Sequence, residues 1–153
     1  MYLVDTNVWL ERLLDQARSE EVGEFLSRTP SEHLFVTDFA FHSIGVVLSG
    51  LNRLEALLRF VQDAFVDGAV TMIHLNPEDS QRIAQVVAQF NLDFDDVYQY
   101  VAAEKYNLTI VSFDSDFDRT ERGRKTPGEV LTWKLMWIRS TQADRRSCCQ
   151  IDP

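Results

Sequence analysis

The sequence predicts an α/β fold built around a mainly parallel central sheet. Short apolar runs, typical of buried strands, alternate along the chain with longer stretches in which apolar residues recur at helical spacing. Strands separated by helical segments favour parallel pairing, because a parallel connection needs a long crossover and a helix usually supplies it. The chain has 153 residues, 45% of them hydrophobic and 25% charged, which suits a single domain with its own core.

Short apolar runs are the candidate strands of this sheet. Two of them lead directly into acidic residues, because the first stops at Asp5 and the last continues to Asp114. A buried strand that ends in a carboxylate carries it to the carboxyl edge of the sheet, where open α/β folds bind their ligands. The expected strands are residues 1–4, 70–75 and 109–112, with residues 34–36 as either strand or loop.

Helices are expected between these strands, where apolar residues recur at i, i+3, i+4 and i+7. Ile44 and Leu48 show this pattern in a helix that Thr37 would cap with its hydroxyl. In the same way, Thr6 or Asn7 suits the N-cap of the first helix, which is expected to begin near residue 8. Further helices are expected over residues 19–27, 54–65, 77–90 and 95–106.

The overall composition argues against several classes of protein. A net charge of -9 argues against a general nucleic-acid coat protein. The sequence has no apolar run near the ~18 residues of a membrane span and no basic start typical of a signal peptide, so a cytoplasmic protein is expected. The adjacent Cys148 and Cys149 offer neither a disulfide framework nor the spacing of zinc ligands.

Three carboxylates are expected to meet at one edge of the sheet. Asp5 and Asp114 follow strands whose carboxyl ends share that edge, and Asp96 lies at the start of the helix that precedes the last strand. Carboxylate oxygens completed by water are a common way to hold Mg²⁺ or Mn²⁺ for phosphodiester chemistry. The alternatives are that Asp5, and Asp95 or Asp96, serve only as helix N-caps.

Three segments together resemble the PIN domain, a family of small metal-dependent ribonucleases that includes VapC-like toxins of type II toxin–antitoxin pairs. The resemblance spans residues 1 to about 118, and the order and spacing of its segments make it fairly specific. The segments are Val4-Asp5-Thr6-Asn7-Val8, the helix headed by Asp96 with Ala102 and Ala103, and residues 110–117, which read Ile-Val-Ser-Phe-Asp-Ser-Asp-Phe.

The resemblance implies a three-layer, Rossmann-like α/β/α sandwich over residues 1–130, followed by a C-terminal extension over residues 131–153. It implies metal-dependent cleavage of RNA by a metal-activated water, with Mg²⁺ or Mn²⁺ as cofactor. An antitoxin partner and a homodimer are further implications. Metal-ligand and catalytic roles are carried onto Asp5, Asp96 and Asp114, with Asp116 as a supporting catalytic residue.

The sequence departs from the family pattern in the second motif. The family usually has an acidic residue, most often Glu, early in the helix that here begins near Thr37, and this helix contains no Glu. Asp38 or His42 may be a substitute, or Ser43 occupies the position and the site works with three acids. Asp38 also suits a purely structural role at the helix N-terminus, and His42 suits a partly buried structural histidine.

A run of basic residues follows the acidic segment directly. Such side chains are suited to hold RNA phosphates on either side of a cleaved bond, and they are equally suited to a solvated loop. Further along, apolar residues fit either a core or a surface for an antitoxin or second subunit. The basic residues are Arg119, Arg122, Arg124 and Lys125, and the later apolar ones are Leu131, Trp133, Leu135 and Trp137.

Two rival functions are compatible with parts of this pattern. A degenerate PIN domain that binds RNA or a protein without cutting is favoured by the missing second-motif Glu. A phosphatase with an aspartyl nucleophile also begins with an Asp at a strand end. It would require a second Asp two residues after Asp5, where this chain has Asn7.

Overall fold

A parallel sheet of four strands lies at the centre of the computed structural model, which describes residues 1–132. All neighbouring strands are parallel, and their spatial order is β3-β2-β1-β4. The predicted parallel sheet is confirmed, residues 34–36 belong to a strand, and the third strand is shorter than expected. The strands are β1 (Tyr2–Val4), β2 (Leu34–Thr37), β3 (Thr71–Ile73) and β4 (Thr109–Val111).

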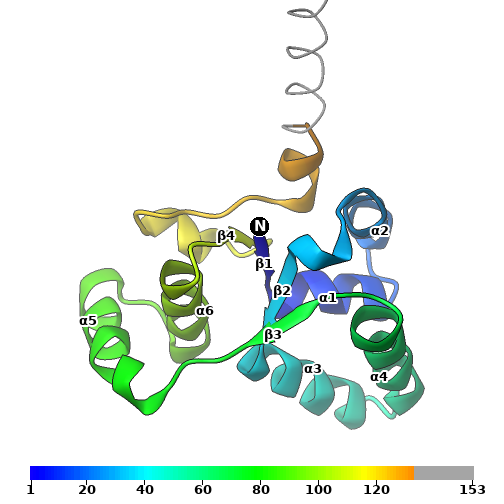
Figure 1. The fold of residues 1–153 in the computed structure, drawn as a ribbon, viewed down its shortest axis with the longest axis horizontal. Coiled ribbons are helices and arrows are strands. Elements are labelled where there is room, and N and C mark those ends of the chain that lie inside the picture. Colours follow the sequence, from blue (N-terminus) through cyan, green and yellow to red (C-terminus); the bar gives the residue numbers. More distant parts are fainter. Residues whose placement is uncertain (133–153) are drawn as a thin grey trace, which may run out of the picture.

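Helices cover both faces of this sheet (Figure 1). The first four pack against one face and the last two against the other. A helical segment also begins at Pro127 and continues to Thr132. No helix within residues 1–132 is long and apolar enough to cross a membrane. The helices are α1 (Thr6–Leu13), α2 (Ser19–Arg28), α3 (Asp38–Gly50), α4 (Leu54–Val61), α5 (Ser80–Phe90) and α6 (Phe94–Lys105).

Short helical turns complete the chain path between these elements. They connect strands to helices, and one of them extends α4 with wider π-helical turns, so that the helix expected over residues 54–65 is nearly continuous. The short elements are η1 (Ser31–His33), η2 (Gln62–Val66), η3 (Pro77–Asp79) and η4 (Ser115–Arg119).

Alternating side chains of the central strands divide the core into two halves. Val4 and Val111 are fully buried among residues of the α1–α4 layer, whereas Leu3 and Ile110 are buried among residues of α5 and α6. This alternation follows from the two-residue repeat of a strand. Strands that are buried on both faces lie between two helical layers, so the predicted three-layer sandwich is confirmed.

Two of the expected helix caps are corrected by the structure. Asp5, rather than Thr6 or Asn7, is the N-cap of α1, and its side chain accepts a hydrogen bond from the Thr6 backbone N–H. Asp93, rather than Asp95 or Asp96, is the N-cap of α6. Because Asp93 caps α6, the first-turn side chains of Asp95 and Asp96 are not needed as caps and are available for other roles.

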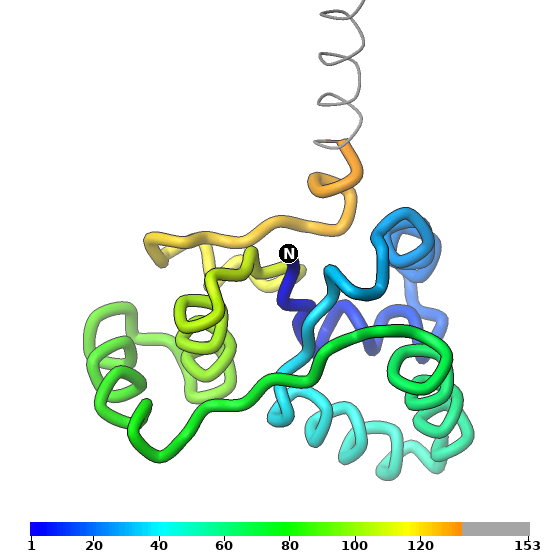
Figure 2. The backbone as a smooth tube through the Cα atoms, in the orientation of Figure 1, coloured from blue at the N-terminus to red at the C-terminus, as the bar shows by residue number. Residues whose placement is uncertain are grey.

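The end of the described chain returns to α2. Residues 120–126 cross from the α6 side of the molecule to the α2 side (Figure 2). There the backbone N–H of Gly128 donates to a Glu21 carboxylate oxygen at 2.8 Å, and Leu131 is buried in the α1–α4 layer. Leu131 is therefore a core residue. The boundary expected at residue 130 stays a prediction, and Trp133, Leu135 and Trp137 lie outside the described residues.

Candidate active site

The candidate site lies where the strand order changes direction. The chain runs outward from β1 to β2 and β3, and then returns to place β4 on the other side of β1. Asp5 follows β1, and its backbone N–H donates to the Val111 carbonyl oxygen at the end of β4 at 3.0 Å. This pairing brings the segment that contains Ser112 and Asp114 beside Asp5. Such a switch point is the usual place for a ligand in an open α/β sheet.

Asp5 is a buried carboxylate that is held by donors on both oxygens. Its side chain is 7% exposed. One oxygen accepts from the Thr6 backbone N–H at 2.6 Å and from the Gln99 amide at 3.2 Å. The other accepts from the Asn7 amide at 2.8 Å and from the Ser112 hydroxyl at 2.7 Å. Burial raises the pKa of Asp5, while these hydrogen bonds favour the charged form and oppose the increase.

The Ser112 hydroxyl links the two strand ends. It donates to Asp5, accepts from the Asn7 amide at 3.0 Å and accepts from the Asp114 backbone N–H at 2.9 Å. The Asn7 side-chain oxygen in turn accepts from the Phe113 backbone N–H at 3.2 Å. Asp114 is therefore placed relative to Asp5 by a fixed network and not by a flexible loop.

Replacing Ser112 with alanine is expected to destabilise the protein by about 1–3 kcal/mol, because buried polar groups lose their partner. Ser112 has no solvent exposure, so water does not readily replace the hydroxyl. The measurement is urea unfolding of both proteins. Ser115→Ala, at an exposed position nearby, is the matched control. An unchanged unfolding midpoint for Ser112→Ala would contradict the linking role.

Asp96 is a second buried carboxylate in the site. It lies in the first turn of α6 and is 9% exposed. Burial, followed by the negative charges of Asp93 and Asp114, raises its pKa to about 7 from the ordinary value of 3.8. No donor among the described residues reaches its carboxylate, so the neighbouring negative charges act without compensation.

These groups surround a pocket of about 240 Å³ that contains five aspartates among its lining residues. The lining residues described include no Lys, Arg or His. Asp116 is outside this lining, is exposed, and forms an ion pair with Arg119 at 2.6 Å. The lining residues are Asp5, Thr6, Asn7, Leu10, Phe39, Ser43, Asp93, Asp95, Asp96, Gln99 and Asp114.

The second-motif helix contributes Phe39 and Ser43 to this pocket, and not Asp38 or His42. Phe39 and Ser43 are four residues apart and share a helix face. Asp38 and His42 each precede one of them by one residue and therefore point about 100° away around the helix axis. The Asp38 carboxylate instead accepts hydrogen bonds from the Tyr98 hydroxyl at 2.8 Å and the Phe39 backbone N–H at 2.9 Å. His42 lines a different pocket. The arrangement favours the alternative in which Ser43 occupies the position of the missing acid.

The basic residues after η4 make separate contacts. Arg122 donates to the Leu108 carbonyl oxygen at 3.3 Å, and Arg124 donates to the Ser112 carbonyl oxygen at 3.1 Å. The backbone of Lys125 pairs with β4. Arg122 and Arg124 therefore have structural contacts, and Arg124 supports the loop that carries Asp114.

Gln99 is a site residue that the sequence analysis missed. Its amide donates to Asp5, and its carbonyl oxygen accepts from the Thr37 hydroxyl at 3.5 Å. The available signal was a polar residue three positions after Asp96, on the same helix face, within the otherwise apolar run from Val97 to Ala103.

The chemistry of these residues fits a hard divalent cation. The available ligands are carboxylate oxygens, and burial, followed by their mutual repulsion, raises the pKa of Asp96. Within residues 1–132, no three His, Cys, Asp or Glu side chains stand close enough together to form a closed ligand cluster. Mg²⁺ usually keeps several waters and takes only one or two carboxylates directly, so a closed cluster is not required. Asp5, Asp96 and Asp114, the ligands expected from the sequence, all line the pocket, and their role as ligands stays a prediction.

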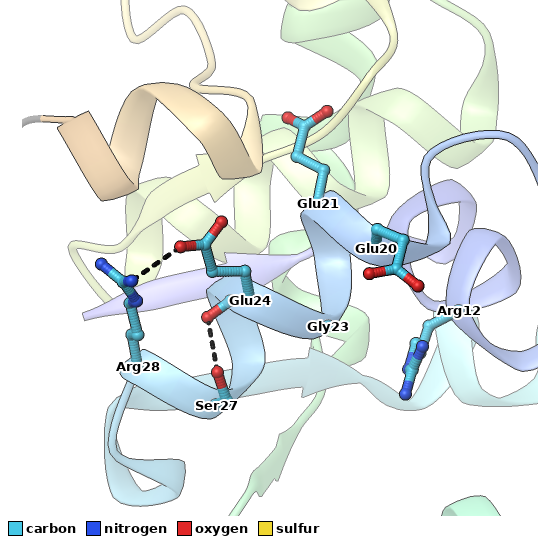
Figure 3. Close-up of a pocket in the computed structure, with 7 residues that line it drawn as sticks. All are labelled: Arg12, Glu20, Glu21, Gly23, Glu24, Ser27 and Arg28. Carbon is cyan, nitrogen blue, oxygen red and sulfur yellow. Dashed lines mark hydrogen bonds and ion pairs between the residues drawn. The ribbon is translucent and has the colours of Figure 1, made fainter.

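A larger pocket of about 570 Å³ lies on α2 and has different chemistry (Figure 3). Acidic and basic side chains both line it, and several are already engaged by the protein. Arg28 pairs with Glu24 at 2.8 Å, Arg12 donates to Ser19, and Glu21 accepts from Gly128. This pocket therefore lacks the uncompensated negative charge of the aspartate pocket.

Comparisons with known proteins agree with this geometry. The fold is similar to that of VapC20 from Mycobacterium tuberculosis, described as a Sarcin-Ricin loop cleaving toxin, with a TM-score of 0.66 and 15% identity over 77% of this chain and 93% of that one. It is also similar to a toxin–antitoxin complex from Klebsiella pneumoniae, with a TM-score of 0.65 and 19% identity over 83% and 98% of the two chains.

A third similar structure is FitAcB from Neisseria gonorrhoeae, with a TM-score of 0.67 and 18% identity over 83% of this chain and 98% of that one. No curated protein matches the sequence. The model of the PIN domain family matches residues 2–123, a range that contains both strand ends and all the aspartates of the pocket. The chain therefore belongs to the PIN domain family.

Proposed function

We propose that this protein is a metal-dependent endoribonuclease that uses Mg²⁺ or Mn²⁺ and acts as the toxin of a toxin–antitoxin pair. PIN domains are generally nucleases. The observation that carries the proposal is the aspartate pocket at the strand switch point, where five aspartates line one cavity and burial, followed by their negative charges, raises the pKa of Asp96 to about 7. Acting on RNA, such an enzyme would work in the cytoplasm.

In this proposal the protein supplies a fixed set of oxygen ligands. Asp5 keeps its position because four donors hold its two oxygens. Asp114 is positioned through Ser112, and Asp116 fixes the same loop because its backbone N–H donates to an Asp114 carboxylate oxygen at 2.8 Å. A bound divalent ion would acidify a water and offset the charge that builds on the phosphate.

Contacts to RNA phosphates are proposed for the basic run after the acidic segment, and Arg119 is its best-placed member. Arg119 is about half exposed and lies one helical turn after Asp116, so it can exchange this carboxylate for a phosphate. Arg122 and Arg124 are weaker candidates because backbone carbonyls already hold their guanidinium groups.

The proposal is tested by incubating single-stranded RNA with the purified protein and Mn²⁺. The wild type should cleave, and Asp114→Asn should lose at least about 100-fold in rate, because changes in groups that merely support a metal ligand already cost 10–100-fold. Asp67→Asn, an exposed carboxylate outside the pocket, should cleave like the wild type. Cleavage that survives in Asp114→Asn would overturn the assignment of the site.

The partner proposals rest on exposed apolar side chains of α3 and α4. Monomeric proteins rarely expose large contiguous apolar patches, so such residues favour contact with another chain. We propose an antitoxin and a second copy of this chain as the partners. The exposed fractions are 58% for Val46, 55% for Leu51, 52% for Leu54 and 69% for Leu58.

The second candidate function is a PIN domain that binds RNA or protein without cutting. Ser43, which lines the pocket where the family usually has an acid, is the observation in its favour. A protein of this kind would give no saturable heat in a calorimetric titration with Mn²⁺, whereas the nuclease should bind the ion.

A further inference from the structure

Three aromatic rings form a continuous cluster beside the aspartate pocket. They are Phe39 from α3 and Phe94 and Tyr98 from α6, and we call them the aromatic platform. Phe39 stacks on Tyr98 with ring centroids 5.2 Å apart and planes 29° apart. Phe94 lies 5.9 Å from Phe39 and 6.4 Å from Tyr98, and thereby extends the cluster outward.

The inner part of the platform is held in place. The Tyr98 hydroxyl donates to Asp38 at 2.8 Å and accepts from the Leu75 backbone N–H at 2.9 Å. Since Phe39 stacks on this fixed ring, a ligand that meets the platform would not have to order it first.

The platform is continuous with the proposed catalytic site. Phe39 itself lines the aspartate pocket. Phe94 is 53% exposed and lies in sequence between Asp93 and Asp95, which both line the pocket. An exposed phenyl ring at this position gives an incoming substrate an apolar surface directly beside the carboxylates.

We propose that the aromatic platform stacks one unpaired base of a single-stranded RNA, next to the bond that is cut. This inference rests on the proposed ribonuclease function and adds that the RNA is bound as a single strand through a stacked base. Stacking on aromatic rings is the usual way in which proteins hold unpaired bases, and it tolerates any base because every base has a π-face.

The negative charge around the aromatic platform favours contact with a nucleobase over direct contact with a phosphate group. The five aspartates of the pocket can contact a phosphate group only through a bound cation, and the described lining residues include no Lys, Arg or His to attract one directly. The face of a nucleobase is uncharged, so stacking on Phe94 is compatible with this acidic surround. A duplex cannot offer that face without unstacking, so the platform selects single-stranded RNA.

The test uses single-stranded RNA that carries 2-aminopurine, a fluorescent base that is quenched when it stacks. Binding is measured with Ca²⁺ in place of Mn²⁺, and gels confirm that the RNA stays intact. Phe94→Ala should bind about 5- to 150-fold more weakly than the wild type and should lose the quenching. Phe94→Trp should retain both affinity and quenching, because the larger ring also stacks.

Val87→Ala is the matched control, since it also removes an exposed apolar side chain, but from α5, which has no proposed binding role. It should leave binding and quenching unchanged. Because Phe94 is half exposed, its replacement is not expected to unfold the protein, and circular dichroism verifies this. Equal affinity and quenching in wild type and Phe94→Ala would overturn the platform, as would the absence of RNA binding by the wild type.

The design separates failure of the platform from failure of the proposed function. If Phe94 governs binding and quenching but the wild type does not cut RNA with Mn²⁺, the platform stands as an RNA-binding surface and the nuclease proposal fails. If the wild type cuts RNA and Phe94→Ala has the same KM, only the platform fails. A shift from dimer to monomer in sedimentation of Phe94→Ala would also overturn it, because the ring would then contact a second copy.

Discussion

Replacing Asp96 with asparagine is expected to abolish RNA cleavage and, at the same time, to stabilise the metal-free protein. Cleavage should fall by at least about 100-fold, because an amide is a poorer ligand for a hard cation than a carboxylate. Burial, followed by the charges of Asp93 and Asp114, raises the pKa of Asp96, so the ionised carboxylate destabilises the folded protein. Because asparagine carries no charge, stability should rise by about 2 kcal/mol at pH 8. The gain is smaller than the full conversion of the pKa shift, since solvent in the open pocket screens the charges.

The contribution of Asp96 to the stability of the folded protein depends on pH. The Asp96 carboxyl ionises near 3.8 in the unfolded chain and near 7 in the folded protein. Between these values the folded protein binds more protons, so the contribution of Asp96 to stability falls as the pH rises from about 4 to 7. Urea unfolding in EDTA at pH 5 and pH 8 should show this decline in the wild type and a smaller one in Asp96→Asn. A variant that is less stable than the wild type at pH 8 would contradict the account.

Replacing Asp5 with asparagine should also abolish cleavage, but with the opposite effect on stability. Either orientation of the amide places its NH₂ group against two of the four donors that now meet the Asp5 carboxylate. Each buried donor without a partner costs about 1–3 kcal/mol, which outweighs the relief of burying a charge. We expect a net loss of about 2 kcal/mol, or roughly 4–8 °C in Tm for a chain of this length.

Thermal unfolding of the two Asp→Asn variants side by side distinguishes ligand loss from unfolding. Both should be inactive, while only Asp5→Asn is less stable than the wild type. Asp67→Asn serves as a common control because its carboxylate is exposed and outside the pocket. If Asp5→Asn unfolded at the wild-type temperature, the donor network described around Asp5 would be wrong.

The architecture was readable from the sequence wherever the apolar pattern was strong. The runs at residues 1–4 and 109–112 gave β1 and β4, since each strand ends in two consecutive apolar residues that are buried on opposite faces of the sheet. Residues 34–36 stayed ambiguous because a three-residue run carries no period. For α1, Asp5 was among the possible N-caps beside Thr6 and Asn7, and the N-cap of α6 was misplaced by two or three residues, since Asp, Thr and Asn are all good N-caps and only the backbone geometry selects among them.

The sequence placed Asp5, Asp96 and Asp114 together, and all three line the pocket, but the predicted Asp116 lies outside it and the groups that position the carboxylates were not predicted. Asp5 and Asp114 could be paired because parallel strands end at one edge. Gln99 was not recognised, because its partner Asp5 is far away in sequence and only the docking of α6 brings them together. Asp38 and His42 were plausible by type, but the rotation of α3 decides which residues line the pocket, and it selects Ser43.

The central claim is that the aspartate pocket holds a divalent cation, and calorimetric titration of Mn²⁺ into the protein at pH 6.5 tests it most directly. Running the titration in two buffers of different ionisation enthalpy reports the protons released on binding. The account predicts saturable binding with proton release in the wild type, because the raised pKa leaves Asp96 largely protonated at this pH and the ion displaces that proton. Asp96→Asn should bind weakly and release fewer protons. No saturable binding by the wild type, or equal binding by Asp96→Asn, would contradict the account.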